Sequence, residues 1–366
     1  MAKPYTPRKG AKLRHKGQIL PFTFWPENYL KYGPIFASEC WTCLSNFVIR
    51  SSVPEKIKLR VLAYIEQSRD FYSASEKASF TTKPLMLYYS YLNLVNAFLL
   101  FRGKITNIDF NAIHGLKPFY PRRYRALTSL GVKLQPSRSG STSVHIFNSL
   151  VEECNFPKLV INKKYNLQDF LCQIVNLRQV GQLFTKGHTQ FFPIRLEFMK
   201  DDCDNAYIKG YIDTSKCNSR SKSSLIDFLS GNKCIRRVRD SSKSLKAYRI
   251  VIESIAQTHY HGPNLASRLR NNLIDKIRNN IWSEQTYSGF RYYLCIDGKF
   301  TAQIATDFAI MFTLGMIARY RPDMLNKVIE RDQWIIHEYL ANQPLQFIYL
   351  LSSGIIRNGI IPITLK

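Results

Sequence analysis

The chain has 366 residues, a length that indicates two domains or one large domain with an insertion. Hydrophobic residues make up 45% of it and charged residues 21%, which excludes a wholly disordered chain. Lysine and arginine number 52 against 26 acidic residues, so the formal net charge is +26. Because such an excess of like charge repels itself, we expect a polyanion as the partner.

The N-terminal segment is basic and lacks the apolar stretch of ~7–15 residues and the cleavage site that a secretory signal needs. The eight cysteines are irregularly spaced, which is not the pattern of a disulfide framework. Both features favour a reducing, cytoplasmic location.

No stretch is predicted to span a membrane. The most apolar one, 85–101, has only 17 residues and includes Ser90, whereas a spanning helix needs ~20 largely apolar residues. The second, 302–320, carries Asp307 and Arg319. We therefore expect both to be buried helices.

In chain order, residues 1–20 hold six lysines and arginines and no acid, which predicts a solvated, mobile arm or one that lies along a phosphate backbone. A capping box at 52–55 predicts a helix of about four or five turns. The next helix is expected to open around Thr82 and to run to Phe101, with Leu92 and Leu99 in the core.

The centre is more mixed. Alternation of apolar and polar residues over 194–199 and 207–212, around the polar turn 201–205, predicts a β-hairpin. Residues 103–150 are irregular, and 214–249 are basic and serine-rich. The other elements that we expect are helices over 165–183 and 265–281, a strand over 290–296 and helices from 302 onward.

These elements predict a mostly helical α+β fold, in which N- and C-terminal helical segments pack together and a central mixed region contains the hairpin. The expected division is a basic arm at 1–22, an N-terminal helical segment at 23–110, a central region at 111–300 with the basic segment 214–249, and a C-terminal helical segment at 301–366.

Five stretches of the chain carry a family resemblance: Phe71–Ser75, Lys83–Leu100, His114–Leu116, Asn166–Leu177 and Phe312–Pro322. In this order they resemble the YaaC-like family of bacterial proteins. The resemblance spans roughly residues 60–360 and leaves the N-terminal arm and the basic segment 214–249 unmatched. It implies a bacterial origin and a shared fold, and it assigns no catalytic residue.

Two residue pairs could support a nuclease. Arg331 and His337 have the spacing of helical ribonucleases of the HEPN type, in which histidine moves a proton and arginine stabilises phosphorane charge. Six residues apart on one helix they diverge, so they would converge only in a dimer or across an irregular turn. Asp297 and Lys299 follow a strand, as in metal-dependent nucleases, with Asp275 or Glu284 as the second acid.

No cofactor or metal is expected. The chain has neither a phosphate-binding GxxxxGK[ST] motif nor a GxGxxG motif before a helix. Cys40 and Cys43 form a lone CxxC pair without further zinc ligands. The acids at 201–204 fit a hairpin turn, and His259 and His261 have no third ligand near them in the sequence.

The strongest functional signal is electrostatic. Basic clusters lie at 1–20, 117–125 and 214–249, and tyrosines within the middle cluster suit base stacking beside phosphate contacts. The residues that we expect to contact nucleic acid are Arg122, Arg123, Arg125, Tyr120, Tyr124, Arg236, Arg237 and Arg239.

The leading hypothesis is a cytoplasmic bacterial protein that binds nucleic acid, DNA or RNA, largely without sequence readout. It would act as a non-enzymatic or accessory subunit of a larger assembly with other protein subunits, and anti-phage defence is one setting for it. The alternatives are a nuclease that uses one of the two pairs above and a protein-interaction subunit with an acidic partner.

Overall fold

The alternating segments form the predicted hairpin, which lies at the centre of the main sheet. Its strands are β10 (Phe191–Asp201) and β11 (Asn205–Asp213). The carboxylate of Asp201 accepts hydrogen bonds from the backbone N–H groups of Cys203 (3.0 Å) and Asn205 (2.8 Å), so the acidic run closes the turn. The computed structural model describes residues 4–136, 143–154, 163–177, 191–215, 217–240, 249–286, 288–296 and 303–363.

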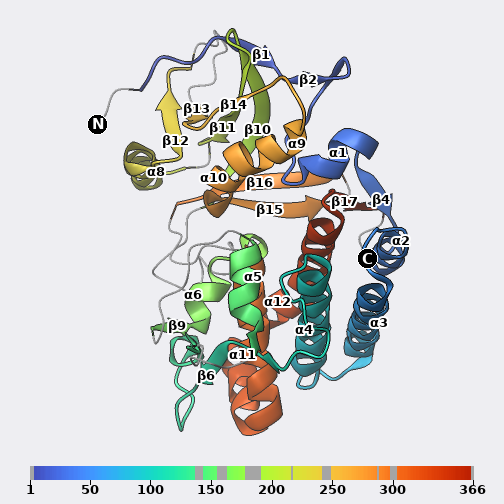
Figure 1. The fold of residues 1–366 in the computed structure, drawn as a ribbon. Coiled ribbons are helices and arrows are strands. Elements are labelled where there is room, and N and C mark those ends of the chain that lie inside the picture. The colour runs from blue at the N-terminus through green and yellow to red at the C-terminus, as the bar shows by residue number, and fades with distance from the viewer. Residues whose placement is uncertain are drawn as a thin grey trace.

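The main sheet is antiparallel and has the strand order β12-β13-β11-β10-β16-β15, with β1 added to β10 and β14 to β11. Helices α1, α9 and α10 lie beside it in the upper part of Figure 1, and α8 packs at the β12 edge. The other strands are β1 (Gly10–Lys12), β12 (Ile235–Val238), β13 (Arg249–Ser254), β14 (Thr258–His259), β15 (Ile281–Thr286) and β16 (Gly289–Cys295). The helices are α1 (Pro26–Tyr32), α8 (Ser219–Gly231), α9 (Leu265–Arg268) and α10 (Asp275–Ile277).

The N-terminal arm is docked on the main sheet, although most of its side chains remain exposed. Tyr5 forms a bridge with Val238 at the outer edge of β12, and β1 pairs with β10. Between them, the guanidinium of Arg8 donates hydrogen bonds to the backbone oxygens of Ser254 (2.8 Å) and Ile255 (3.2 Å). The sequence predicted a solvated, mobile arm, whereas the described arm pairs with strands about 190 and 230 residues away in the chain.

The first and last long helices pack together in the lower part of Figure 1, as predicted. Helix α4 lies at the centre and contacts its neighbours α3, α11 and α12. The short helix α2 packs against α3 and α12. The bounds are α2 (Cys40–Ile49), α3 (Glu55–Lys77), α4 (Lys83–Phe101), α11 (Gln303–Tyr320) and α12 (Pro322–Ile356).

Helix α4 is apolar almost all round because it is buried on most sides. Among the described residues it is the one helix whose length and composition would suffice to cross a membrane, but 72% of its most apolar window is buried by the rest of the protein. Leu99 is fully buried, as predicted, whereas Leu92 is only half-buried and packs at the margin of the core.

Residues 112–177 pack on the helices, chiefly on α11 and α4, rather than on the main sheet. The central region expected at 111–300 therefore consists of two structural parts, with residues 191–296 in the sheet. The elements of the first part are β5 (Ala112–Ile113), β6 (Leu116–Phe119), η1 (Leu127–Ser129), β7 (Gly131–Leu134), β8 (Val144–His145), α5 (Ile146–Glu153), β9 (Lys164–Asn166), α6 (Leu167–Leu171) and η2 (Val175–Leu177).

Three predicted helices differ in the structure. The segment from Tyr165 begins as strand β9 and continues as the five-residue helix α6 and a 3-10 turn, and residues 178–183 lie outside the described part. Helix α3 begins at Glu55 without a capping bond from Ser52 and is longer than expected, with 23 residues. The 265–281 segment is α9, a π-helical turn, α10 and a 3-10 turn, and Ile281 already begins β15.

Two small pairings connect the remaining segments. Strand β4 (Ile35–Ala37) pairs in parallel with β17 (Ile360–Pro362), which holds the chain end that follows α12 beside the segment after α1. Strands β2 (Arg14–His15) and β3 (Gln18–Ile19) form a short hairpin after the arm. The β4–β17 pairing holds the C-terminal end of the described chain at the junction between the sheet and the helices (Figure 1).

Candidate nucleic-acid interface

The loop between β6 and β7 is docked on the first half of α12. The hydroxyl of Tyr124 donates a hydrogen bond to the carboxylate of Asp332, and Arg331 donates one to the backbone oxygen of Arg125. The guanidinium of Arg321 lies over the ring of Tyr120, 5.6 Å from its centre. The tyrosines and the backbone thus fix a loop that has little regular structure of its own.

The three arginines of this loop remain exposed. Within the described part of the chain, no carboxylate forms an ion pair with Arg122, Arg123 or Arg125. Three guanidinium groups within four residues repel one another, and nothing among the described contacts offsets that repulsion. The loop therefore presents uncompensated positive charge to solvent.

The helices add further cations beside the loop. Together they form what we call the loop–helix surface, which includes the exposed ends of α11 and α12. Arg321 is paired with Asp323 (3.1 Å), and this contact lowers the pKa of the carboxyl group. The members are Tyr120, Arg122, Arg123, Tyr124, Arg125, Arg319, Tyr320, Arg321, Lys327, Arg331 and Trp334.

Aromatic side chains on this surface divide into docked and exposed ones. Tyr124 is half-buried, and burial together with the bond to Asp332 raises its pKa. By contrast, Tyr320 is 57% exposed and Trp334 is 48% exposed. Sequence reasoning missed these two. Trp334 could have been found, because it follows Arg331 by three residues and so shares its helix face.

The basic cluster on β12 is held differently. Arg236 pairs with Glu253 (3.2 Å), which is completely buried, and lies over the ring of Tyr5. Arg237 accepts a hydrogen bond from the backbone of Tyr5 and Arg239 donates one to it, both through main-chain atoms. The side chain of Arg239 is exposed, whereas the charge of Arg236 is compensated by Glu253.

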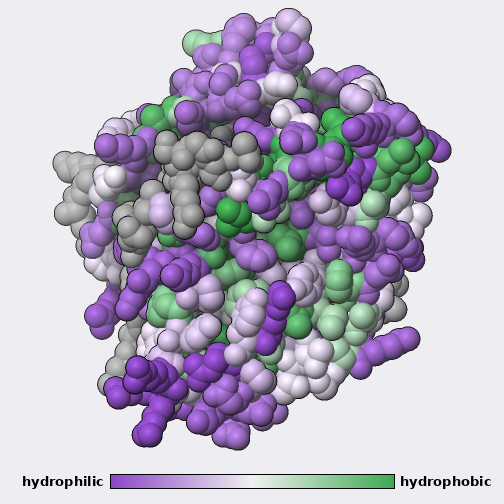
Figure 2. Space-filling view, turned by 60° about the horizontal axis from the view of Figure 1, so that its bottom comes forward, coloured by the Kyte–Doolittle hydropathy of each residue, from purple (hydrophilic) through white to green (hydrophobic). Residues whose placement is uncertain are grey.

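The structure does not bring the two predicted clusters together. Strand β12 lies at the upper end of the molecule and the loop after β6 at the lower end (Figure 1). Seen from below, the surface interleaves hydrophilic and hydrophobic side chains (Figure 2). We therefore treat the loop–helix surface and the arginines at β12 as two separate basic regions.

Arg331 and His337 line the same hollow on α12. Asp332 has non-helical φ and ψ angles and kinks α12 between the two residues. Both then line a depression of about 380 Å³. The His337 ring stacks on Phe80, with ring centres 5.8 Å apart. The irregular turn that such a pair requires is thus present.

The metal-dependent alternative finds less support. Asp297 and Lys299 lie outside the described residues. Of the two candidate partner acids, Asp275 is paired with Arg270 (3.2 Å), and Glu284 accepts a hydrogen bond from Tyr293 (2.7 Å).

The described residues contain no cluster of three or more metal-ligand side chains. The eight cysteines are reduced thiols, and burial raises the pKa of Cys40. Of the two neighbouring histidines, His261 contacts the carboxylate of Asp204 at 3.2 Å. Nothing in the described part of the chain therefore assembles a metal centre.

The family model described as YaaC-like protein matches residues 31–355, which is nearly the whole chain. The match takes in the long helices, the main sheet apart from β1, and all of the loop–helix surface. No curated protein and no solved structure matches the chain.

Proposed function

The chain belongs to the YaaC-like protein family, and we propose that it binds nucleic acid through the loop–helix surface, largely without reading the sequence. The observation that carries this proposal is the set of three exposed loop arginines that lack a carboxylate partner among the described residues. Backbone phosphates would relieve their mutual repulsion, and phosphate contacts supply the sequence-independent part of nucleic-acid affinity.

The exposed aromatic residues favour single strands. Tyr320 and Trp334 are both exposed. Arg319 lies over the Tyr320 ring, 5.0 Å from its centre, and Trp334 lines the same hollow as Arg331. Stacking on such a ring contributes ~1–3 kcal/mol per base and tolerates any base, but it requires bases that are not already paired. We therefore expect single-stranded DNA or RNA to bind more tightly than a duplex of the same length.

The binding test uses fluorescence anisotropy with labelled single-stranded and duplex oligonucleotides. The variant replaces Arg122, Arg123 and Arg125 with alanine. Its control replaces Lys31, Lys56 and Lys276, which are exposed cations elsewhere on the protein, so both variants lose the same net charge. We expect weaker binding only for the first. Equal losses in both would show that net charge alone is responsible and would contradict a defined surface.

We place this binding activity in a cytoplasmic bacterial subunit of a larger assembly, with anti-phage defence as its setting. The excess charge of +26 is the supporting observation, because it calls for a polyanion in the cell. Affinity purification at low salt, with and without nuclease treatment, tests the assembly. Partners that remain after nuclease treatment are held by protein contacts, and an acidic protein among them would favour the protein-interaction alternative.

A second candidate function is metal-independent RNA cleavage in the hollow on α12. The kink at Asp332 that lets Arg331 and His337 share this hollow is the observation in its favour. There the histidine would move the proton of the attacking hydroxyl group, and the guanidinium would stabilise the charge that develops on the phosphate.

We expect cleavage of single-stranded RNA in the presence of EDTA if this candidate is correct. His337→Ala should then slow it by ~10²–10⁴-fold, the usual contribution of an acid–base group. Asn326→Ala, an exposed residue of the same helix outside the hollow, serves as the control. Cleavage that persists in His337→Ala, or that appears only with Mg²⁺, would contradict this assignment.

A further inference from the structure

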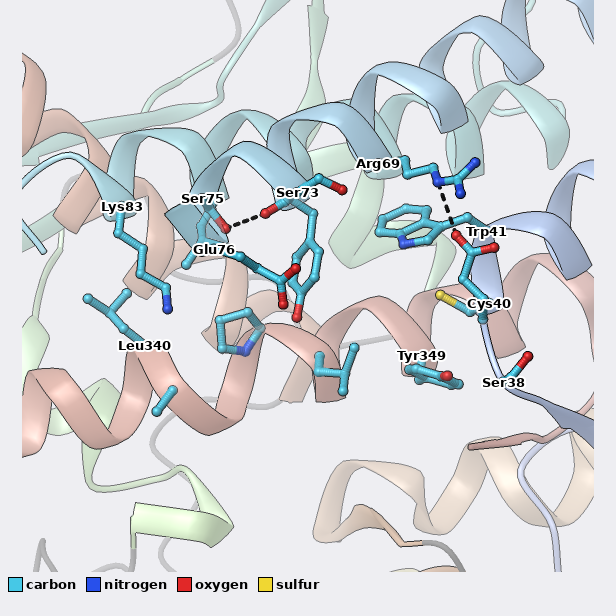
Figure 3. Close-up of a pocket in the computed structure, with 16 residues that line it drawn as sticks. Ser38, Cys40, Trp41, Arg69, Ser73, Ser75, Glu76, Lys83, Leu340 and Tyr349 are labelled. Carbon is cyan, nitrogen blue, oxygen red and sulfur yellow. Dashed lines mark hydrogen bonds and ion pairs between the residues drawn. The ribbon is translucent and has the colours of Figure 1, made fainter. Parts of the chain in front are cut away.

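A cavity of about 470 Å³ lies apart from the loop–helix surface, in the groove between α3 and α12. The start of α2 closes one end, where Ser38 and Cys40 lie, and Lys83 and Leu340 lie at the other end (Figure 3). This volume is within the range of small-molecule sites. The stretch Phe71–Ser75 and the following Glu76, Lys83 and Leu87 supply much of its wall, and most of these residues fall in the blocks that resemble the family.

Three aromatic side chains line the cavity and keep their polar atoms free. Trp41 is 6% exposed and Tyr349 is 4% exposed. Within the described part of the chain, no hydrogen bond involves the indole N–H of Trp41 or the hydroxyl groups of Tyr72 and Tyr349. Burial raises the pKa of Tyr72 to about 12, and the nearby Glu76 carboxylate contributes. The phenol thus remains a hydrogen-bond donor.

The charged groups of the wall include one pair that is already satisfied. Glu39 and Arg69 are 3.0 Å apart and neutralise each other near the α2 end. Glu76 and Lys83 have no ion-pair partner among the described residues, and they lie together in the half of the cavity away from Cys40 (Figure 3). One end of the cavity therefore offers a free carboxylate and a free ammonium group.

We propose that this cavity binds a small zwitterion of the α-amino-acid class with an aromatic side chain. Glu76 receives its ammonium group and Lys83 its carboxylate, both as charge-assisted hydrogen bonds. The aromatic side chain lies among Trp41, Tyr72 and Tyr349, where ring contacts and area burial hold it. Their free N–H and O–H groups are positioned to bind a polar atom on the ring.

The charges that line the cavity favour a zwitterion over a nucleotide. A phosphate would meet a single lysine, and the adjacent Glu76 would repel it. The four charged side chains that line the cavity are two acids and two bases, so the site as a whole is neutral. A neutral site fits a zwitterion, and it differs in kind from the uncompensated charge of the loop–helix surface.

Isothermal titration calorimetry on the full chain tests the proposal with L-phenylalanine, L-tyrosine and L-tryptophan. Each amino acid is compared with the amine that lacks its carboxylate and with the acid that lacks its ammonium group. We expect at least one of the three to bind, and the loss of either charge to weaken binding by about tenfold, as for other hydrogen bonds to charged groups.

Two variants assign the contacts. Glu76→Gln should weaken binding of the amino acid and of the amine by about tenfold and leave binding of the acid unchanged. Lys83→Met should weaken binding of the amino acid and of the acid by about tenfold and leave binding of the amine unchanged. Asp70→Asn and Lys77→Met, which are exposed on α3 outside the cavity, should change nothing. Thermal unfolding checks that each variant is folded, and both cavity residues are on the surface of the protein.

The proposal fails if none of the three amino acids binds at about 10 mM, a concentration well above the dissociation constant expected of a specific site. It also fails if the variants weaken all the analogues equally, or if a nucleoside monophosphate binds where the amino acids do not. None of these results bears on nucleic-acid binding, because the two sites share no residue.

Discussion

Asp307 is a buried carboxyl group in the centre of the helices. It lies on α11 with no exposed surface and accepts a hydrogen bond from Gln343 of α12 at 2.9 Å. Tyr91 of α4 and Tyr339 of α12 are the ionisable groups that face it, and the Tyr339 hydroxyl donates to its backbone oxygen. Burial raises the pKa of Asp307 well above its usual range, so the group is folded in its neutral form.

This group makes stability fall as pH rises. In the unfolded chain Asp307 loses its proton near pH 3.9, whereas in the folded chain it keeps the proton to a higher pH. Between these values the folded state binds more protons, so the free energy of unfolding decreases by up to ~1.4 kcal/mol per pH unit.

We therefore expect Asp307→Asn to be more stable than the wild type at neutral pH and equal to it near pH 4. The amide cannot ionise and still offers an oxygen to Gln343. Urea unfolding at several pH values from 4 to 8 measures the difference. Parallel curves for the two proteins would show that Asp307 does not hold its proton in the fold.

Arg236 lies on β12 and Arg239 directly follows that strand, and the two residues differ in what they contact. Among the described residues, Arg236→Ala leaves the buried carboxylate of Glu253 with one hydrogen bond, from the backbone N–H of Arg8 in the arm at 3.1 Å. The expected loss is about 1.5–3 kcal/mol of stability, the value of a hydrogen bond to a charged group. Arg239→Ala, whose side chain is exposed, is the control and should leave the unfolding midpoint unchanged. Chemical denaturation measures the free energy of unfolding of both variants. Equal values would show that Arg236 has no structural role.

At the scale of elements, α4 is the helix on which the lower half of the protein is built. Leu99→Ala should lower the free energy of unfolding by ~2–5 kcal/mol, because the side chain is fully buried and a cavity remains. Leu92→Ala should cost less, since that side chain already contacts water. Equilibrium unfolding measures the loss of stability in each variant, and the two are comparable because both are Leu→Ala changes in the same helix. An equal cost would contradict the observed burial.

Sequence patterns predicted the elements that are defined locally. The hairpin of β10 and β11 follows from strict alternation, and α4 follows from a long apolar run. The prediction failed where the partner is distant: β1 pairs with β10, almost two hundred residues later. It also failed after Tyr165, where apolar residues at helical spacing are buried as a strand, a single helical turn and a 3-10 turn. A short apolar run cannot by itself distinguish these structures.

At the scale of the whole molecule, the sequence identified cations but not how their charges are compensated. The loop cluster and the β12 cluster read alike as runs of arginine, yet the fold neutralises Arg236 with Glu253 and leaves Arg122 and Arg123 unpaired among the described contacts. Which carboxylate lies beside which arginine depends on contacts across the fold, and no spacing in the chain encodes it. The same holds for the cavity between α3 and α12, whose walls come from distant segments.

The most direct test of the proposed function is the salt dependence of nucleic-acid binding by the wild type and by the triple variant of Arg122, Arg123 and Arg125. If the wild-type protein contacts six or so phosphates, its affinity should fall by ~10³ or more between 50 and 200 mM salt. The triple variant should remain folded and show a slope reduced by up to ~3, about one for each phosphate that an arginine no longer neutralises. An unchanged slope with a lower melting temperature would show that the arginines are structural and would contradict the proposed surface.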